Sequence, residues 1–338
     1  GMANQYIINS HFIPSSFGIL FLAAIFFFLR RNYIGTSFCI AGAVSFHPAM
    51  MFVGVVFSLA FIVRQFTEGA SLKSVALFAG GTLLLSLPAG AYSIWLVTSG
   101  PSELLNQSME IYRQIRSPGT QLISEWMNTQ GTVRLGLFFV AIILVRRTSL
   151  GFIMIMVFGV SFIFTLFHLV FDDMFFSMMT PWRVMAVLTP LSTGIIVFWC
   201  VRYFEQKFRE NNFVLILSSA FLLLMTFFCL WMGVTRTFQH FSSKLNSDDF
   251  DRLTVYVREH KVKGDVYIIP PNKRYFRLHA QVPVFVDFKG FPTESWAVIE
   301  WNKRIHMVKR LYKNGIMDKE LIHLFKGYPV THVVLETK

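Results

Sequence analysis

The sequence is 338 residues long, 54% hydrophobic and only 15% charged, whereas a soluble domain carries about 25% charged residues. This composition excludes an ordinary soluble domain and predicts a polytopic membrane protein. The net charge of +12 comes from scattered basic residues with no nucleic-acid-binding motif, so we expect a lipid bilayer and no nucleic acid as partner. The three cysteines lie inside apolar runs without paired spacing, which argues against disulfides and a cysteine metal site.

The chain begins "GMANQYIINSHFIP", which lacks the basic segment and cleavage site of a signal peptide. A chain that opens on Gly-Met either is an internal fragment of a longer protein or carries a cloning remnant, and we expect a fragment because nothing acidic precedes Glu68. Residues 1–235 then form the predicted helical membrane domain. Its apolar segments are 13–29, 33–63, 74–98, 131–145, 150–171, 184–204 and 213–235.

The segment 33–63 contains "AGAVSFHPAMMFV", where a histidine and a proline interrupt the apolar run. It is either one long tilted helix kinked at Pro48 or two short spans with His47 and Pro48 at the turn. Arginine and lysine are enriched in short cytoplasmic loops. If 33–63 is one span, the inside loops hold six of these residues and the outside loops seven. If it is two spans, the inside loops hold nine and the outside loops four. We therefore predict about eight spans, two of them short, with His47 at the outer mouth.

Residues 236–338 are far more polar and predict a small soluble α/β domain on the outer side. Runs of β-branched and aromatic residues indicate strands at 264–271, 282–288 and 331–336. An apolar stripe that recurs at helical spacing predicts a helix at 293–315, and a second helix is expected near 317–326.

Ionisable residues at the edge of the hydrocarbon mark candidate sites, because charge there is costly unless it is paired or hydrated. Asp172 and Asp173 end one predicted span and Arg183 opens the next. A carboxylate could act as a base or hold a divalent metal ion, and an arginine could bind a lipid-linked phosphate. Alternatively, these residues are paired end caps. His47 is either a contact to phosphate or hydroxyl or a hydrogen-bonded turn residue.

Two further places carry candidate residues. The long loop 99–132 predicts an amphipathic surface helix on which Arg113 and Arg116 lie one turn apart, placed either to bind a lipid phosphate or to sit near headgroups without specificity. In the tail, Arg277, Asp287 and Lys289 follow strands, where ligands bind in open α/β sheets. The alternative for these three is a solvated rim.

The quoted patches also carry a family resemblance. The pattern span–"RR"–span–"HP" and the tail pattern "IIPPNKRYFRLHAQVPVFVDFKGFP…IEWNKRI" resemble bacterial polytopic membrane proteins related to GT-C-type glycosyltransferases. In the tail, the resemblance rests on Phe276-Arg277, on the "VDFK" strand and on an "EW..R" helix with Glu300, Trp301 and Arg304.

The resemblance implies a transferase in the bacterial inner or plasma membrane that takes a sugar from a polyprenyl- or dolichyl-phosphate donor on the outer face. GT-C enzymes place a catalytic acid in their first outer loop, and nothing acidic precedes Glu68 here. The resemblance therefore implies a chain that lacks the first spans, or one that is not catalytic in that way, and we assign no catalytic base.

Two other functions stay open at this stage. A transporter, flippase or assembly scaffold with a partner-docking tail fits the scarcity of acidic residues, but no ionisable residue in the middle of a span marks an ion path. A fragment without independent activity is the third alternative. No cofactor is assigned, and a divalent metal ion is left open.

Overall fold

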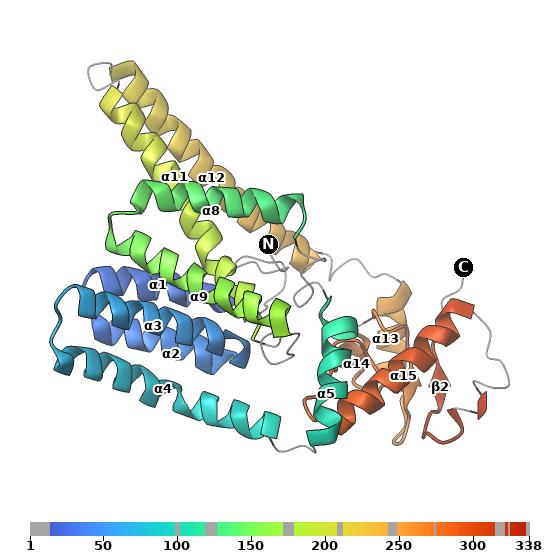
Figure 1. Ribbon diagram of the computed structural model, residues 1–338. Helices are drawn as coiled ribbons and strands as arrows, with labels where there is room; N and C mark the ends of the chain where they lie inside the picture. The colour runs from blue at the N-terminus through green and yellow to red at the C-terminus, as the bar shows by residue number, and fades with distance from the viewer. Residues whose placement is uncertain are drawn as a thin grey trace. The chain divides into compact units, whose positions relative to one another are not determined.

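The computed structural model describes residues 14–98, 102–118, 127–171, 179–207, 212–242, 249–273, 275–314, 322–323 and 325–335. The chain divides into two compact units. The first comprises Gly1–Trp95 and Ser117–Thr237, and the second comprises Leu96–Arg116 and Phe238–Lys338. Helices dominate both units (Figure 1).

The first unit is a bundle of apolar helices. Its elements are η2 (Pro14–Phe17), α1 (Gly18–Leu29), α2 (Tyr33–Phe46), η3 (Pro48–Met50), α3 (Met51–Thr67), α4 (Leu72–Thr98), α8 (Thr129–Val145), α9 (Ser149–Phe171), η5 (Pro181–Val184), α11 (Met185–Lys207) and α12 (Asn212–Ser242).

Three stretches in the described part of the chain are long and apolar enough to cross a membrane: Leu72–Trp95, Ser149–Phe171 and Pro181–Lys207. Helices α1, α2, α3 and α8 are apolar but shorter. A helix of 14 residues, such as α2, rises only about 21 Å, less than the roughly 30 Å of a hydrocarbon core. The predicted helical membrane architecture is thus present, with short helices among long ones.

The segment 33–63 forms two helices that run in opposite directions. Helix α2 ends where His47 adopts an extended conformation, and Pro48 opens the short η3 turn. Proline suits this position because the missing N–H would have no partner in a first helical turn. A Cβ atom built on Gly54 of α3 would lie 3.5 Å from Ile40 and 2.6 Å from Val44 of α2. Residues 14 apart could not meet in one continuous helix, so the chain reverses at His47-Pro48.

Aromatic side chains fill the core where α1, α3 and α4 meet. The Phe28 and Phe61 rings stack with centroids 4.3 Å apart, and Phe21 stacks on Phe57 at 5.2 Å. Phe78 of α4 contacts Phe61 edge-on. Four of these five side chains are at most 2% exposed and Phe28 is 3% exposed. The paired positions show that α1 and α3 run parallel.

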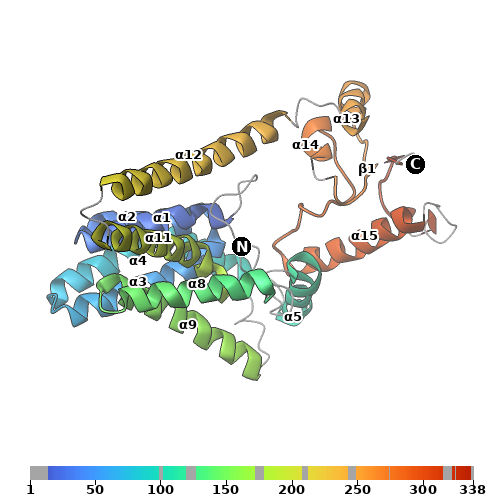
Figure 2. The same ribbon diagram turned by 90° about the horizontal axis from the view of Figure 1, so that it is seen from above.

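Most basic residues of the first unit gather at one end of the bundle. Arg64 near the end of α3 contacts Ser149 and the ring of Phe152 at the start of α9, so the turns α1–α2, α3–α4 and α8–α9 share this end. We call it the basic end; it carries Arg30, Arg31, Arg64, Lys73, Arg146 and Arg147. Helix α11 starts at the opposite end, beside η5, and packs against α8 (Figure 2).

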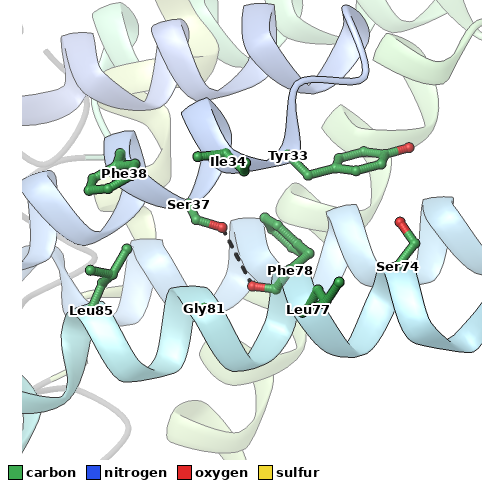
Figure 3. A pocket seen from close by; sticks show the side chains of 9 residues that line it. All are labelled: Tyr33, Ile34, Ser37, Phe38, Ser74, Leu77, Phe78, Gly81 and Leu85. Atoms are coloured by element: carbon green, nitrogen blue, oxygen red, sulfur yellow. Dashed lines mark hydrogen bonds between the residues drawn. The ribbon is translucent and has the colours of Figure 1, made fainter.

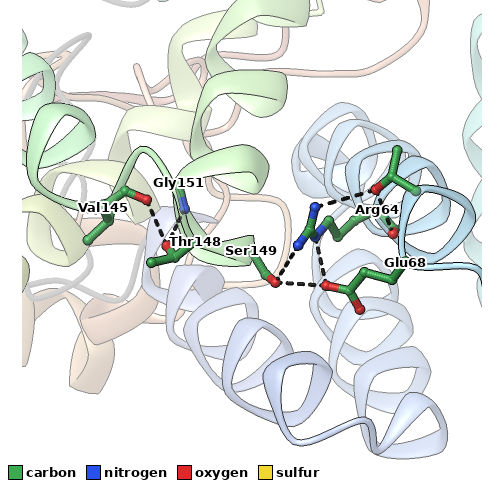
Figure 4. Close-up of polar contacts among 7 residues, drawn as sticks. Arg64, Glu68, Val145, Thr148, Ser149 and Gly151 are labelled. Atoms are coloured by element: carbon green, nitrogen blue, oxygen red, sulfur yellow. Dashed lines mark hydrogen bonds and ion pairs between the residues drawn. The ribbon is translucent and has the colours of Figure 1, made fainter.

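A polar cluster joins α3 to α9 at the basic end (Figure 4). Arg64 pairs with Glu68 at 2.7 Å and donates to Ser149 Oγ at 2.9 Å, and Ser149 donates to Glu68 at 2.7 Å. The neighbouring α8–α9 turn requires a glycine at Gly151, because a Cβ atom there would lie 2.1 Å from the Val145 carbonyl oxygen.

The second unit has a small parallel sheet under α15 (Ser295–Asn314). Strand β1 (Tyr267–Ile268) pairs with β2 (His332–Val333), and Tyr267 also bridges to Val284. Two of the three predicted strand regions therefore hold short strands, and the third contributes only the bridge. Two helices that the sequence reading did not predict, α13 (Asp249–His260) and α14 (Phe276–Ala280), precede and follow β1.

The segment 102–116 belongs to this second unit. Its helix α5 (Ser102–Ile111) continues into the π-helical turn η4 (Tyr112–Arg116). Ile111 is 7% exposed in the core formed with Trp301 and Val308 of α15, and Ser108 donates to Ser295 Oγ at 3.2 Å. The apolar face of the predicted surface helix is thus covered by α15.

Candidate functional site

Arg183 lies at the end of the bundle opposite the basic end, which we call the His47 end. It is 8% exposed, and its guanidinium donates to the Ala49 carbonyl oxygen at 3.0 Å. Thr180 holds a left-handed backbone with φ of 45°, and the Arg183 N–H donates to the Thr180 carbonyl at 3.0 Å. This tight turn directs the guanidinium inward towards the α2–α3 connection.

His47 lies in that α2–α3 connection. Its Nδ1 atom accepts a hydrogen bond from the Ala49 N–H at 3.1 Å, which requires an unprotonated Nδ1. Burial lowers the pKa of His47, and the positive charge of Arg183 lowers it further. The imidazole is therefore neutral at pH 7. It caps the turn before α3, as one of the two sequence interpretations predicts, and it lies beside the buried Arg183.

The other candidates from the predicted membrane domain, residues 1–235, do not join this pair among the described residues. Asp172 and Asp173 lie outside the described residues. Arg113 and Arg116 belong to the second unit. Arg113 pairs with Glu110 at 3.1 Å, and Arg116 lies over the rings of Phe288 and Phe291 at 5.2 and 5.9 Å. The Arg116 guanidinium thus connects η4 to the rest of the second unit, and the Arg113 ion pair connects η4 to α5.

A cavity of about 270 Å³ opens beside the sheet of the second unit. Arg277 of α14 and Asp287, two of the three tail candidates, both line it. Asp287 is 4% exposed and follows the segment that bridges to β1. The Arg277 Nη1 atom lies 3.8 Å from its carboxylate. Lys289 is exposed and does not line the cavity.

Helix α15 supplies the opposite wall. Glu300 accepts from Arg304 at 2.8 Å and from the Tyr328 hydroxyl at 2.9 Å. The hydrogen bond from Arg304 is the main cause of the lowered pKa of Glu300. The Arg304 guanidinium also lies over the Phe285 and Tyr328 rings at 5.1 and 5.0 Å. Glu300 is therefore an ionised carboxylate, and Arg304, Tyr328 and Phe285 hold this wall in place.

Trp296 and Gly290 complete the cavity and were not singled out from the sequence. Trp296 is 58% exposed on the first turn of α15. The Gly290 N–H donates to Asp287 in an Asx-type turn. The segment "DFKG" is a visible signal for this turn, but no short-range pattern marks Trp296 as a cavity residue.

A second groove lies between α2 and α4 (Figure 3). It encloses about 250 Å³ and is lined almost entirely by apolar groups such as Phe38, Leu77 and Leu85. The hydroxyl of Ser37, which lines the groove, already accepts a hydrogen bond from Thr82 at 2.8 Å. Apart from the hydroxyls of Tyr33, Ser37 and Ser74, the groove offers only apolar packing surface.

The described residues contain no group of three or more His, Cys, Asp and Glu side chains that could hold a metal ion. A family model described as a domain of unknown function, DUF6798, matches residues 248–308. That is less than a fifth of the chain, and it includes every residue that lines the cavity of the second unit. No curated protein and no solved structure matches the chain.

Proposed function

We propose that the chain is a membrane-embedded, glycosyltransferase-like protein that takes a sugar from a polyprenyl-phosphate donor on the outer face of a bacterial inner or plasma membrane. In this proposal the helical unit crosses the bilayer about eight times. The basic end is cytoplasmic, because arginine and lysine are retained there in short loops. The His47 end and the second unit then lie on the outer side.

The observation that carries the proposal is the buried Arg183 beside His47, at the end opposite the basic one. A guanidinium in an apolar helical bundle is costly unless it serves a ligand or a structural bond. A guanidinium can bind phosphate oxygens through two parallel N–H donors, which suits a lipid-linked phosphate at the membrane boundary. His47 is neutral beside it and adds no competing charge.

The first test measures donor binding by the full chain in nanodiscs, with polyprenyl-phosphate hexoses as the probe and native mass spectrometry as the readout. Arg183→Gln is expected to weaken binding about tenfold or more. Arg183→Lys retains the positive charge but lacks the parallel N–H donors, so its affinity for the donor should lie between those of Arg183→Gln and the unaltered chain. Arg134→Gln, which removes a cation from the start of α8 at the same end, is the matched control and should bind as the unaltered chain does.

Absence of donor binding, or equal losses in Arg183→Gln and Arg134→Gln, would overturn the proposal. Thermal unfolding of each variant separates a lost contact from a lost fold. Ion-coupled uptake into proteoliposomes would instead identify the chain as a transporter.

A second test concerns sidedness. In a cysteine-free background, Lys73→Cys reports the basic end and Thr129→Cys the start of α8 at the opposite end. A membrane-impermeant maleimide applied to intact cells should label position 129 at once and position 73 only after permeabilisation. Equal labelling of both positions in intact cells would contradict the topology.

A further inference from the structure

The cavity of the second unit brings together four charged side chains whose charges cancel. Asp287 and Glu300 are carboxylates, and Arg277 and Arg304 are guanidiniums. Each carboxylate has a guanidinium partner, at 3.8 Å for Asp287 and 2.8 Å for Glu300. An anionic ligand would meet two carboxylates at close range, and an apolar ligand would remove water from four charges without replacing their hydrogen bonds. The lining therefore favours a neutral ligand rich in hydrogen-bonding groups.

The arrangement of donors and acceptors narrows the ligand class. A carboxylate next to a guanidinium presents acceptors and donors side by side, and a pair of neighbouring hydroxyl groups can use both, since each hydroxyl donates and accepts. Arg277 is the more accessible guanidinium for this role because its side chain is 54% exposed, whereas Arg304 is bound by Glu300 and lies over two aromatic rings. Neighbouring hydroxyls on a rigid ring are the defining groups of a saccharide.

An exposed indole at the rim completes the site. Trp296 is 58% exposed while Trp301, five residues later, is 4% exposed and donates its indole N–H to the Asp287 carbonyl at 3.0 Å. Trp301 is therefore a structural residue, and Trp296 is the ring with a face open to a ligand. The C–H face of a sugar ring can pack on such an indole while its hydroxyls reach the charged groups.

We infer that this cavity binds a single neutral sugar ring, through Asp287, Glu300 and Arg277 to the hydroxyls and through Trp296 to the ring face. The cavity volume of about 270 Å³ is just below the roughly 300–1,000 Å³ of sites for drug-sized ligands, which suits one ring. If the chain is the proposed transferase, this cavity is the site for the sugar acceptor. Only the acceptor role rests on the proposed function, because sugar binding itself is argued from the cavity.

The test uses the full chain in nanodiscs or in a detergent without a sugar headgroup. Saturation-transfer NMR is recorded with methyl glycosides of neutral hexoses and N-acetylhexosamines, and with glucuronate and inorganic phosphate as anionic probes. At least one neutral methyl glycoside should give a signal. Trp296→Ala should lower the affinity measured from that signal about tenfold, and Trp296→Phe should largely preserve it. Tyr256→Ala, which removes another exposed aromatic ring of the second unit, should leave the affinity unchanged.

Three results would overturn the inference: no signal from any neutral methyl glycoside, equal affinity in Trp296→Ala and the unaltered chain, or preference for the anionic probes. A chain that binds methyl glycosides but not polyprenyl-phosphate sugars keeps this site and loses the proposed transfer. The reverse result loses only this site, so the two proposals fail separately.

Discussion

Gly54 of α3 lies directly against Val44 of α2, and a Cβ atom at Gly54 would come within 2.6 Å of the Val44 methyl group. This close contact allows the two short helices to fold back on each other at His47-Pro48. Gly54→Ala is expected to destabilise the bundle by about 1 to 3 kcal/mol, because β-branched Val44 has little rotamer freedom to move away. Thermal unfolding in detergent measures the loss.

The matched control for this prediction is Gly80→Ala, where a Cβ atom would meet nothing within 4 Å. The double variant with Gly54→Ala and Val44→Ala should recover part of the stability, since the second change removes the clashing methyl groups. Additive losses in the double variant would show that the two helices do not meet as described.

Ser149 of α9 makes hydrogen bonds with both Arg64 and Glu68 at the end of α3. Ser149→Ala removes both hydrogen bonds and is expected to cost about 0.5 to 1.5 kcal/mol. Thr193→Ala is the control, because the Thr193 hydroxyl bonds only within its own helix in the described contacts. Denaturant unfolding of both variants checks the difference, and equal midpoints would refute the role of Ser149.

Ile111 is buried in the core of the second unit although its helix lies more than 100 residues before the rest of that unit. Ile111→Ala should destabilise the second unit by about 2 to 5 kcal/mol. Limited proteolysis should then cleave within 249–335 sooner than in the unaltered chain. Leu72→Ala, at a side chain that is 73% exposed, should not change that cleavage. Unchanged cleavage in Ile111→Ala would place 102–116 outside the second unit.

His47 gives the first unit a pH dependence of defined sign. Burial and Arg183 lower the pKa of His47 in the folded protein, so the unfolded chain binds more protons below about pH 6.5. Its contribution to stability is fully present above that pH and decreases as the pH falls below it. The melting temperature should therefore fall on acidification.

His47→Asn tests this assignment, because the amide oxygen can still accept from the Ala49 N–H without titrating. The variant should lose part of the acid sensitivity and keep its stability at neutral pH. His260→Asn changes an exposed histidine of the second unit and is the control. An acid response in His47→Asn equal to that of the unaltered chain would rule His47 out as its source.

Local patterns determined much of the helical unit. Apolar runs predicted its helices, and Asn32 and Asn128 cap α2 and α8 by accepting from the N–H groups of Gly35 and Gly131. Proline after His47 predicted the break, and the spacing of basic residues predicted which turns share an end. The caps and the break depend on residues only a few positions apart, and the number of basic residues in each loop is counted without any tertiary contact, so the sequence alone reveals them.

Tertiary packing decided the rest. Ser108 meets Ser295 from 187 positions away, which makes a predicted surface helix part of the second unit and places Arg116 over the ring of Phe288. The cavity likewise exists only because Tyr267 pairs with Val284 while α15 packs alongside, so that Arg277, Asp287 and Glu300 converge. Contacts at such separations are determined by which apolar faces bury one another, and no local pattern in the chain encodes that choice.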